Sequence, residues 1–207
     1  MRTLTKEMQS SISPSMALEL LKDGNKRFVN NLKINRNLLQ QANETSDGQH
    51  PFAVILSCID SRTSAELIFD QGLGDIFSVR IAGNVVNEDI LGSMEFGCKV
   101  AGAKIIVVLG HTKCGAVKGA CDNVELGNLT GLISKIKPAV DQEMSTIENR
   151  NSSNGVFVEN VAELNVGLSV KNILVKSPII AEMVKNGDIG IVGGVHDIAT
   201  GEVKFFE

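Results

Sequence analysis

Runs of apolar residues divide the chain into regular segments. Residues 52–56 and 105–109 are unbroken apolar runs that end at polar residues or glycine. Continuous runs of this length are typical of strands that are covered on both faces of a parallel sheet. Residues 76–81 and 189–195 predict two more strands, and a turn at 199–202 leads into a short last strand at 203–206.

Apolar residues at helical spacing lie between these strands. Ser13 and Pro14 form a cap followed by proline at the first helical position, and the apolar stripe behind them continues to about Asn31. Residues 32–48 are polar and rich in asparagine, which indicates an extended arm or connector. Further helices are predicted at 63–72 (opening on a capping box at 63–66), 87–102, 113–120, 129–140 (disturbed at Pro138), 161–175 and 177–187, with a loop at 141–155.

Strands that alternate with helices predict an α/β fold. We expect a mainly parallel four-stranded sheet flanked by helices, with an antiparallel C-terminal edge strand and an N-terminal helical arm. The length of 207 residues fits a single domain, 1–207, in which residues 1–45 form the N-terminal helix and arm. Such an arm either reaches across a partner subunit or packs on its own domain, and the sequence leaves both arrangements open.

Composition narrows the classes of function. A net charge of −4 and the absence of Trp and Tyr give no basic face or stacking platform for nucleic acid. No apolar run approaches the roughly 18 residues of a membrane helix, so no membrane contact is expected. The N-terminus has no apolar segment typical of a secretory signal, so the cytoplasm is the expected location and the four cysteines are expected to stay reduced.

Candidate chemistry follows two of the buried strands. Cys58 comes just after the first strand, and His111 and Cys114 come just after the third. Ligands of an open parallel sheet bind outside the carboxyl ends of its strands, so these side chains are expected to meet. Two thiolates and one imidazole suit zinc, and three protein ligands leave a fourth position free, as in catalytic sites. The sequence therefore predicts one Zn²⁺ per chain.

Two plainer interpretations stay open. The three residues could be buried cysteines and a hydrogen-bonded histidine without a metal. They could also belong to a closed structural zinc site with Cys98 or Cys121 as fourth ligand. Cys98 lies in the middle of a predicted helix, and Cys121 lies about 10 Å beyond Cys114 along another, so neither reaches the site easily.

Asp60 and Arg62 share the loop that carries Cys58. A carboxylate beside a guanidinium keeps its charge, because the opposite charge lowers its pKa. An ionised Asp60 only accepts hydrogen bonds, so it suits the orientation of an oxygen ligand next to the metal. We therefore expect Asp60 and Arg62 to form a catalytic pair, rather than an ordinary surface ion pair.

The motif Cys-x-Asp-x-Arg at 58–62, followed by His-x-x-Cys-Gly at 111–115, resembles the β-class carbonic anhydrases. The segments 21–28, 79–84 and 108–111 also resemble that family, and the similarity extends from about residue 16 to the C-terminal strand. The resemblance implies zinc binding by Cys58, His111 and Cys114 and an orienting role for Asp60 and Arg62.

The resemblance also implies three substrate-binding positions. Gln49 matches a glutamine that hydrogen-bonds substrate, often across a dimer interface. Phe77 matches an apolar wall near CO2, and the backbone N–H of Gly115 matches an anion-binding position.

The function implied by the resemblance is the reversible hydration of CO2 to bicarbonate and a proton, by attack of zinc-bound hydroxide on CO2. The partners implied are CO2, bicarbonate and further copies of the chain, in a homodimer or a dimer of dimers. Residues 1–45 would then embrace the partner and bring Gln49 near its zinc. A CS2 hydrolase with the same ligands is one alternative, and a non-catalytic zinc or redox protein with a fourth protein ligand or a disulfide is another.

Some members of this family close the site by moving the aspartate onto the metal. Those members hold an inhibitory bicarbonate ion with a tryptophan three residues before the first cysteine, a tyrosine and an arginine. In this chain Ile55 occupies the tryptophan position and tyrosine is absent, although Arg80 matches the arginine. Without the aromatic groups the anion loses much of its preference for the closed state. We therefore expect an Asp60–Arg62 pair and no cooperative inhibition by bicarbonate.

Overall fold

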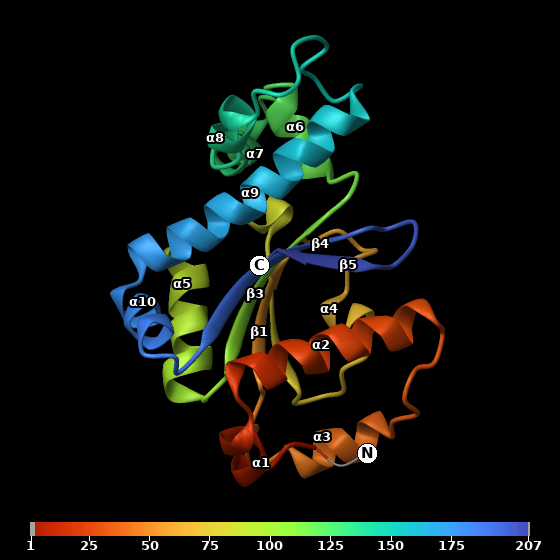
Figure 1. Ribbon diagram of the computed structural model, residues 1–207, viewed down its shortest axis with the longest axis vertical. Coiled ribbons are helices and arrows are strands. Elements are labelled where there is room, and N and C mark those ends of the chain that lie inside the picture. Colours follow the sequence, from red (N-terminus) through yellow and green to blue (C-terminus); the bar gives the residue numbers. More distant parts are fainter. Residues whose placement is uncertain (1–2, 207) are drawn as a thin grey trace.

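The computed structural model describes residues 3–206, and five strands in that range form one sheet (Figure 1). The spatial order is β2-β1-β3-β4-β5. The first four strands run parallel and β5 runs antiparallel to β4, as predicted. The strands are β1 Ala53–Ser57, β2 Ile76–Arg80, β3 Ile105–His111, β4 Gly190–His196 and β5 Val203–Phe206.

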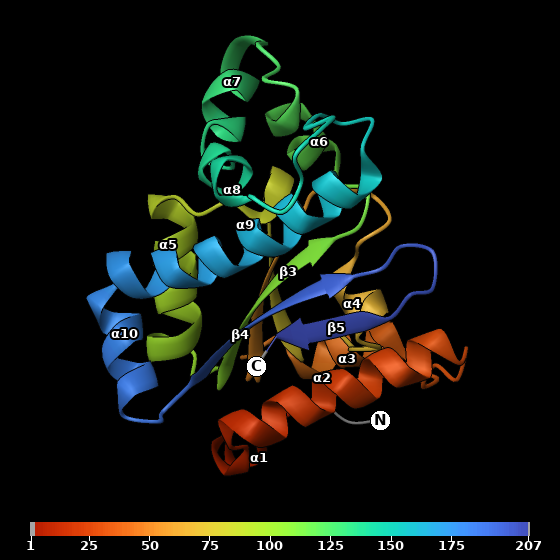
Figure 2. The same ribbon diagram turned by 45° about the horizontal axis from the view of Figure 1, so that its top comes forward.

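Helices cover both faces of the sheet, which explains the unbroken apolar runs. The side chains of Val54, Leu56 and Val108 lie in a core with helices α5, α9 and α10, whereas Ile55 and Val107 face α2 and α4. Figures 1 and 2 show the first group of helices side by side, opposite α2. The helices named so far are α2 Pro14–Val29, α4 Ala65–Ile68, α5 Glu88–Glu95, α9 Gly155–Lys176 and α10 Pro178–Lys185.

A third apolar cluster lies beyond the carboxyl ends of the strands. It joins α6 Gly115–Cys121, α7 Gly127–Ile133 and α8 Lys137–Gln142 to the first half of α9. Figure 1 shows these helices at the top of the molecule, above the ends of β1 and β3. Cys58 and Cys114 belong to this cluster, so these two candidate ligands are buried within it.

Local sequence signals placed most element ends correctly. All five strands lie within two residues of the prediction. Ser13, Asn87 and Ser177 accept hydrogen bonds from the backbone N–H of Met16, Ile90 and Ile180, the third residue after each cap, as helix-capping residues do. After α5 the chain continues through one π-helical turn, η2 Phe96–Val100.

Several expectations differ from the structure. The helix predicted at 161–175 begins earlier, at Gly155. Thr63 does not cap α4. The helix begins after Ser64 without a side-chain cap, and the Thr63 hydroxyl instead donates to the carbonyl oxygens of Asp60 and Cys58, at 3.0 and 3.5 Å. Residues 32–48 contain a helix, α3 Leu38–Glu44, capped by Asn37. The predicted helix at 129–140 is divided into α7 and α8, with Pro138 in the first turn of α8.

The N-terminal segment packs on its own domain. The side chain of Gln9 in α1 Lys6–Ser11 donates to the carbonyl oxygens of Pro51 and Ala101, at 2.7 and 2.8 Å. Asp70, which is 4% exposed, accepts hydrogen bonds from Arg27 and Arg36. These contacts match packing of the N-terminal segment on its own domain, one of the two arrangements that the sequence left open. An embrace of a partner by residues 1–45 stays a prediction.

None of the helices formed by residues 3–206 combines the length and the apolar character needed to span a membrane.

Candidate metal centre

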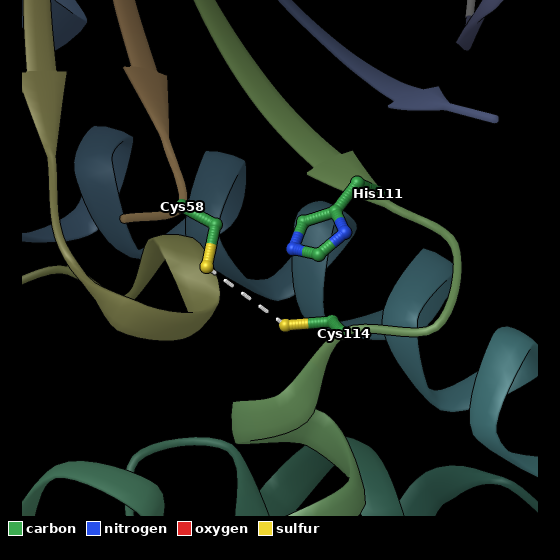
Figure 3. A group of neighbouring side chains, drawn as sticks. All are labelled: Cys58, His111 and Cys114. Carbon is green, nitrogen blue, oxygen red and sulfur yellow. Dashed lines mark hydrogen bonds between the residues drawn. The ribbon is translucent and has the colours of Figure 1, made fainter. Parts of the chain in front are cut away.

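The three candidate ligands meet where the strand order reverses. The chain passes from β1 to β2 on one side and then to β3 on the other, so the carboxyl ends of β1 and β3 border the switch point. Cys58 directly follows β1, His111 is the last residue of β3, and Cys114 is the N-cap of α6. Figure 3 shows the three side chains pointing toward one another from these elements.

The ligand atoms are close together and buried. One donor atom from each residue lies within 4.8 Å of the others, and the two sulfur atoms are 4.0 Å apart. Cys58, His111 and Cys114 are 4%, 1% and 1% exposed. Among residues 3–206 the group contains no fourth histidine, cysteine or carboxylate, which argues against a closed structural zinc site.

Hydrogen bonding leaves one histidine nitrogen free for a metal. The Nδ1 atom of His111 lies 2.9 Å from the carbonyl oxygen of Thr112. Its Nε2 atom is buried and, within the described part of the chain, has no hydrogen-bond partner. A buried polar atom without a partner is costly unless a ligand satisfies it. Together with the two sulfur atoms, this nitrogen makes a donor set that fits zinc.

The pKa values of the two thiols are shifted in opposite directions. The pKa of Cys58 is lowered, mainly by a hydrogen bond from Cys114 and further by His111 and the backbone N–H of Gly83, which outweigh burial. The pKa of Cys114 is raised, because ionised Cys58 and burial both disfavour a second thiolate. A bound cation would favour ionisation of both, since metal binding releases thiol protons.

Asp60 and Arg62 form a bidentate ion pair. The guanidinium donates from Nε and Nη2 to the two carboxylate oxygens, at 2.9 and 2.7 Å. Hydrogen bonds from Arg62 hold the pKa of Asp60 far below its usual range. Because an Asp60 oxygen also lies 3.9 Å from Nε2 of His111, the ionised carboxylate borders the candidate ligand group, and its catalytic role stays a prediction.

Further residues hold this loop in ways that sequence reasoning missed. Arg80 donates to the carbonyl oxygens of Cys58 and Asp60, at 3.0 and 2.6 Å. Gly83 lies in the short helix η1 Ala82–Asn84 and donates its N–H to the Cys58 sulfur at 3.4 Å, and Asn165 of α9 holds the Gly83 carbonyl oxygen at 2.8 Å. These contacts join distant segments, so no local pattern could have revealed them.

The structure does not bring all predicted site residues together. Gly115 follows Cys114 directly and has open space where a side chain would project. Gln49 is exposed and precedes β1, so β1 separates it from Cys58. Phe77 pairs with Val54 early in β2 and packs edge-on against Phe96, with 6.1 Å between ring centroids. Neither Gln49 nor Phe77 therefore adjoins the ligand group of its own chain.

The other two cysteines lie outside the candidate ligand group. Cys98 and Cys121 are buried in separate apolar clusters, and desolvation raises their pKa values to about 12 and about 11. Among residues 3–206, the group of donor atoms that lie within 4.8 Å of one another includes neither of these two sulfur atoms. Their exclusion from the ligand group agrees with the sequence analysis.

Comparison with known proteins gives a consistent family assignment. The family model described as carbonic anhydrase matches residues 53–203. Carbonic anhydrase 2 of Mycobacterium tuberculosis is 35% identical over 196 residues, covering 91% of this chain and 91% of that protein. A carbonic anhydrase of Mycolicibacterium smegmatis is 34% identical over 194 residues, covering 93% of each chain.

Solved structures agree with this assignment. The β-carbonic anhydrase CafA of Aspergillus fumigatus superposes with a TM-score of 0.73 at 25% identity, covering 93% of this chain and 90% of that one. One of the tetrameric β-carbonic anhydrases of Sordaria macrospora superposes with a TM-score of 0.71 at 26% identity, covering 79% and 84% of the two chains.

Proposed function

The chain belongs to the β-carbonic anhydrase family, and from that premise we propose that Cys58, His111 and Cys114 hold its catalytic zinc ion. It is an enzyme that catalyses the reversible hydration of CO2 to bicarbonate and a proton. The observation that carries the zinc assignment is the group of three buried donor atoms within 4.8 Å, one of them a histidine nitrogen without another partner.

A zinc ion at these residues would supply hydroxide from water near neutral pH, chemistry for which carbonic anhydrases with three histidine ligands are the standard example. The protein's own part is to hold the donors and to keep water oriented. Two thiolates neutralise a divalent cation, so this ligand set acidifies water less than three imidazoles do. Neighbouring groups therefore contribute more to the chemistry.

Asp60 is the group placed for that contribution. Its ionised carboxylate is acceptor-only, is fixed by Arg62 and lies beside the His111 nitrogen. It would accept a hydrogen bond from an oxygen ligand of the metal and so orient the oxygen lone pair toward CO2. Arg80 and Thr63 hold the loop backbone, which keeps the carboxylate in place without help from the substrate.

The substrate-binding residues belong to an assembly in this proposal. Gln49 and Phe77 do not adjoin the ligand group of their own chain, so they would serve the site of another subunit. The relatives from Sordaria macrospora are tetrameric, which supports a homodimer or a dimer of dimers. Gly115 would offer its N–H to the anionic product. A single domain of residues 1–207 and a cytoplasmic location complete the proposal.

The direct test combines zinc analysis with stopped-flow CO2 hydration. Wild-type protein should contain one zinc per chain and hydrate CO2 faster than it hydrolyses CS2. Cys114→Ser should lose metal and activity together, whereas Cys98→Ala, which removes a buried thiol elsewhere, should keep both. Full zinc occupancy in Cys114→Ser, with unchanged ligand absorption after cobalt substitution, would refute the ligand assignment.

A further inference from the structure

Thr112, the residue between His111 and the turn to α6, uses all three of its polar groups. Its backbone N–H donates to the carbonyl oxygen of His196 at 3.0 Å. Its hydroxyl oxygen accepts the N–H of Ile198 at 3.1 Å. Its own carbonyl oxygen lies 2.9 Å from Nδ1 of His111. Thr112 thus connects the ligand histidine to the end of β4 and the turn that follows it.

The contact with His111 determines which histidine nitrogen is free. A carbonyl oxygen only accepts hydrogen bonds, so Nδ1 must carry the proton. In a neutral imidazole the lone pair is then on Nε2, the buried nitrogen that faces the sulfur atoms. Hydrogen bonds of this kind fix the tautomer and ring orientation of histidine ligands.

The position of that carbonyl depends on a strained turn. Lys113, the next residue, has a φ of +58°, in the left-handed region that side chains other than glycine rarely adopt. Such a conformation persists only where the surroundings hold the backbone firmly. The two hydrogen bonds from Thr112 to the β4 side supply such a hold, immediately before the strained residue.

The turn after β4 is arranged to provide the second of these bonds. The carboxylate of Asp197 caps the N–H groups of Ala199 and Thr200, at 2.7 and 3.3 Å. It leaves the N–H of Ile198 for the Thr112 hydroxyl. The β4–β5 hairpin therefore presents a donor to the ligand turn, although neither of its strands contributes a ligand.

We propose that Thr112 is a positioning residue for zinc binding, which fixes the tautomer and orientation of His111 by tying the ligand turn to the end of β4. This inference rests on the proposed function, because it concerns the same zinc site. A threonine that only stabilised the turn would affect unfolding and leave zinc affinity unchanged.

The test uses Thr112→Val, which keeps the side-chain shape and removes the acceptor. Zinc affinity of the holoenzyme, measured by chelator competition, should fall about tenfold, the lower end of the effect of residues that hold metal ligands. In ¹⁵N-histidine-labelled holoenzyme, the Nδ1–H proton of His111 should exchange faster with solvent. Thr112→Ser, which keeps the hydroxyl, should restore both values.

Ile198→Pro tests the same bond from the donor side. Ile198 is the first residue of the turn that follows Asp197, and proline is favoured at the second position of β-turns, so the change removes the N–H that Thr112 accepts. It should lower zinc affinity as much as Thr112→Val, and the double variant should be no worse than either single one. It also keeps the test valid if Thr112→Val does not fold.

Thr130→Val is the matched control, because it loses an equivalent bond from the N–H of Leu126, at 2.8 Å, in the first turns of α7. Its zinc affinity should stay within about twofold of wild type. Equally unchanged affinity and exchange in Thr112→Val and Ile198→Pro would overturn the inference. Wild-type protein without zinc would overturn the proposed function, and this inference with it.

Discussion

At the scale of single residues, the site depends on a carboxylate that is kept ionised. Asp60 has an opposite charge on one side and the ligand histidine on the other. Arg62 is 52% exposed at its side chain, whereas Asp60 is 16% exposed. The guanidinium thus faces solvent and the carboxylate faces the site, which suits a group that accepts a hydrogen bond from a reacting oxygen.

Asp60→Asn should reduce CO2 hydration by about 10²-fold, the upper end of the effect of residues that orient the ligands of a metal. The amide keeps the size of the side chain and loses its charge, so zinc content should not change. Stopped-flow kinetics and metal analysis measure the two effects. Asp141→Asn, at an exposed carboxylate on α8, is the control, and activity of Asp60→Asn within a few-fold of wild type would contradict the role.

Bicarbonate should inhibit the enzyme without cooperativity. Arg80 is committed to the carbonyl oxygens of Cys58 and Asp60, and Ile55 is fully buried in the core. An anion that cannot gain contacts in a closed state cannot favour that state. Initial rates against bicarbonate concentration should therefore follow a simple hyperbolic inhibition curve. A sigmoidal curve, or a crystal structure at alkaline pH with Asp60 on zinc, would refute the expectation.

At the scale of elements, the site is held by short segments that cross between layers. The helix η1 connects Cys58 to α9 through Gly83, which has a φ of +67°. A Cβ atom at Gly83 would come within 2.6 Å of Ile136 and 3.2 Å of Ala116. Both the conformation and the packing at this position therefore require glycine.

Gly83→Ala should lower the free energy of unfolding by about 1–3 kcal/mol, because it forces a side chain into a left-handed and crowded position. Urea unfolding followed by circular dichroism gives the value. The control is Gly131→Ala in α7, where nothing lies within 4 Å of the added Cβ atom, and it should stabilise the protein by about 0.5–1 kcal/mol. Equal stability of the two variants would show that Gly83 is not constrained.

The loop between α8 and α9 depends on one buried carboxylate. Burial alone would raise the pKa of Glu143, but hydrogen bonds from Ser145, Asn160 and Thr146 lower it to about 2. Arg150 adds an ion pair at 2.8 Å, and Glu143 is only 2% exposed. The ionised form is therefore much better accommodated by the folded protein than by the unfolded chain.

This arrangement predicts a loss of stability in acid. The pKa of Glu143 in the folded protein is below its unfolded value of 4.5. The stability that ionised Glu143 contributes to the fold is therefore fully present above about pH 4.5 and is lost as the pH falls toward 2. Its size is about 3 kcal/mol. Glu143→Gln should be less stable at neutral pH and show a flatter decline in acid. Glu159→Gln, an exposed position on α9, should keep the wild-type profile, and coincident profiles would contradict this account.

At the scale of the whole molecule, the proposed substrate-binding residues lie away from the proposed zinc ligands of the same chain. The zinc ligands lie at the carboxyl ends of the strands, and Gln49 lies before the amino end of β1. Phe77 lies on β2, which is an edge strand of the sheet. In the proposed assembly a second copy along that edge would receive these residues, so we expect the protein to form at least a homodimer.

Complementation tests this arrangement. Gln49→Ala should lose about tenfold in activity, the value of one lost hydrogen bond to substrate, and keep its zinc. Co-expression with Cys114→Ser should produce mixed dimers in which one intact zinc site receives Gln49 from the other chain. Activity above the sum of the two variants is expected, with Gln40→Ala as an inert control. A monomeric, active protein in sedimentation, or no gain on co-expression, would refute it.

The sequence by itself determined the strands, most of the helices and the residue types of the candidate ligands. Buried strands need continuous apolar runs, and helix caps act within three residues, so these signals are local. Because parallel strands end at one edge of a sheet, Cys58 and His111 could be expected to meet there.

Only the tertiary structure decided which distant segments hold those ligands. The insertion of β3 beside β1 brings the ligand residues together, and the contacts of Arg80, Gly83 and Thr112 depend on that strand order. Thr63 shows the same limit. It matches a helix-capping motif, but in the structure its hydroxyl donates to the carbonyl oxygens of Cys58 and Asp60 and caps no helix. Hydrogen bonds go to the partners that folding brings within reach, and sequence spacing does not specify those partners.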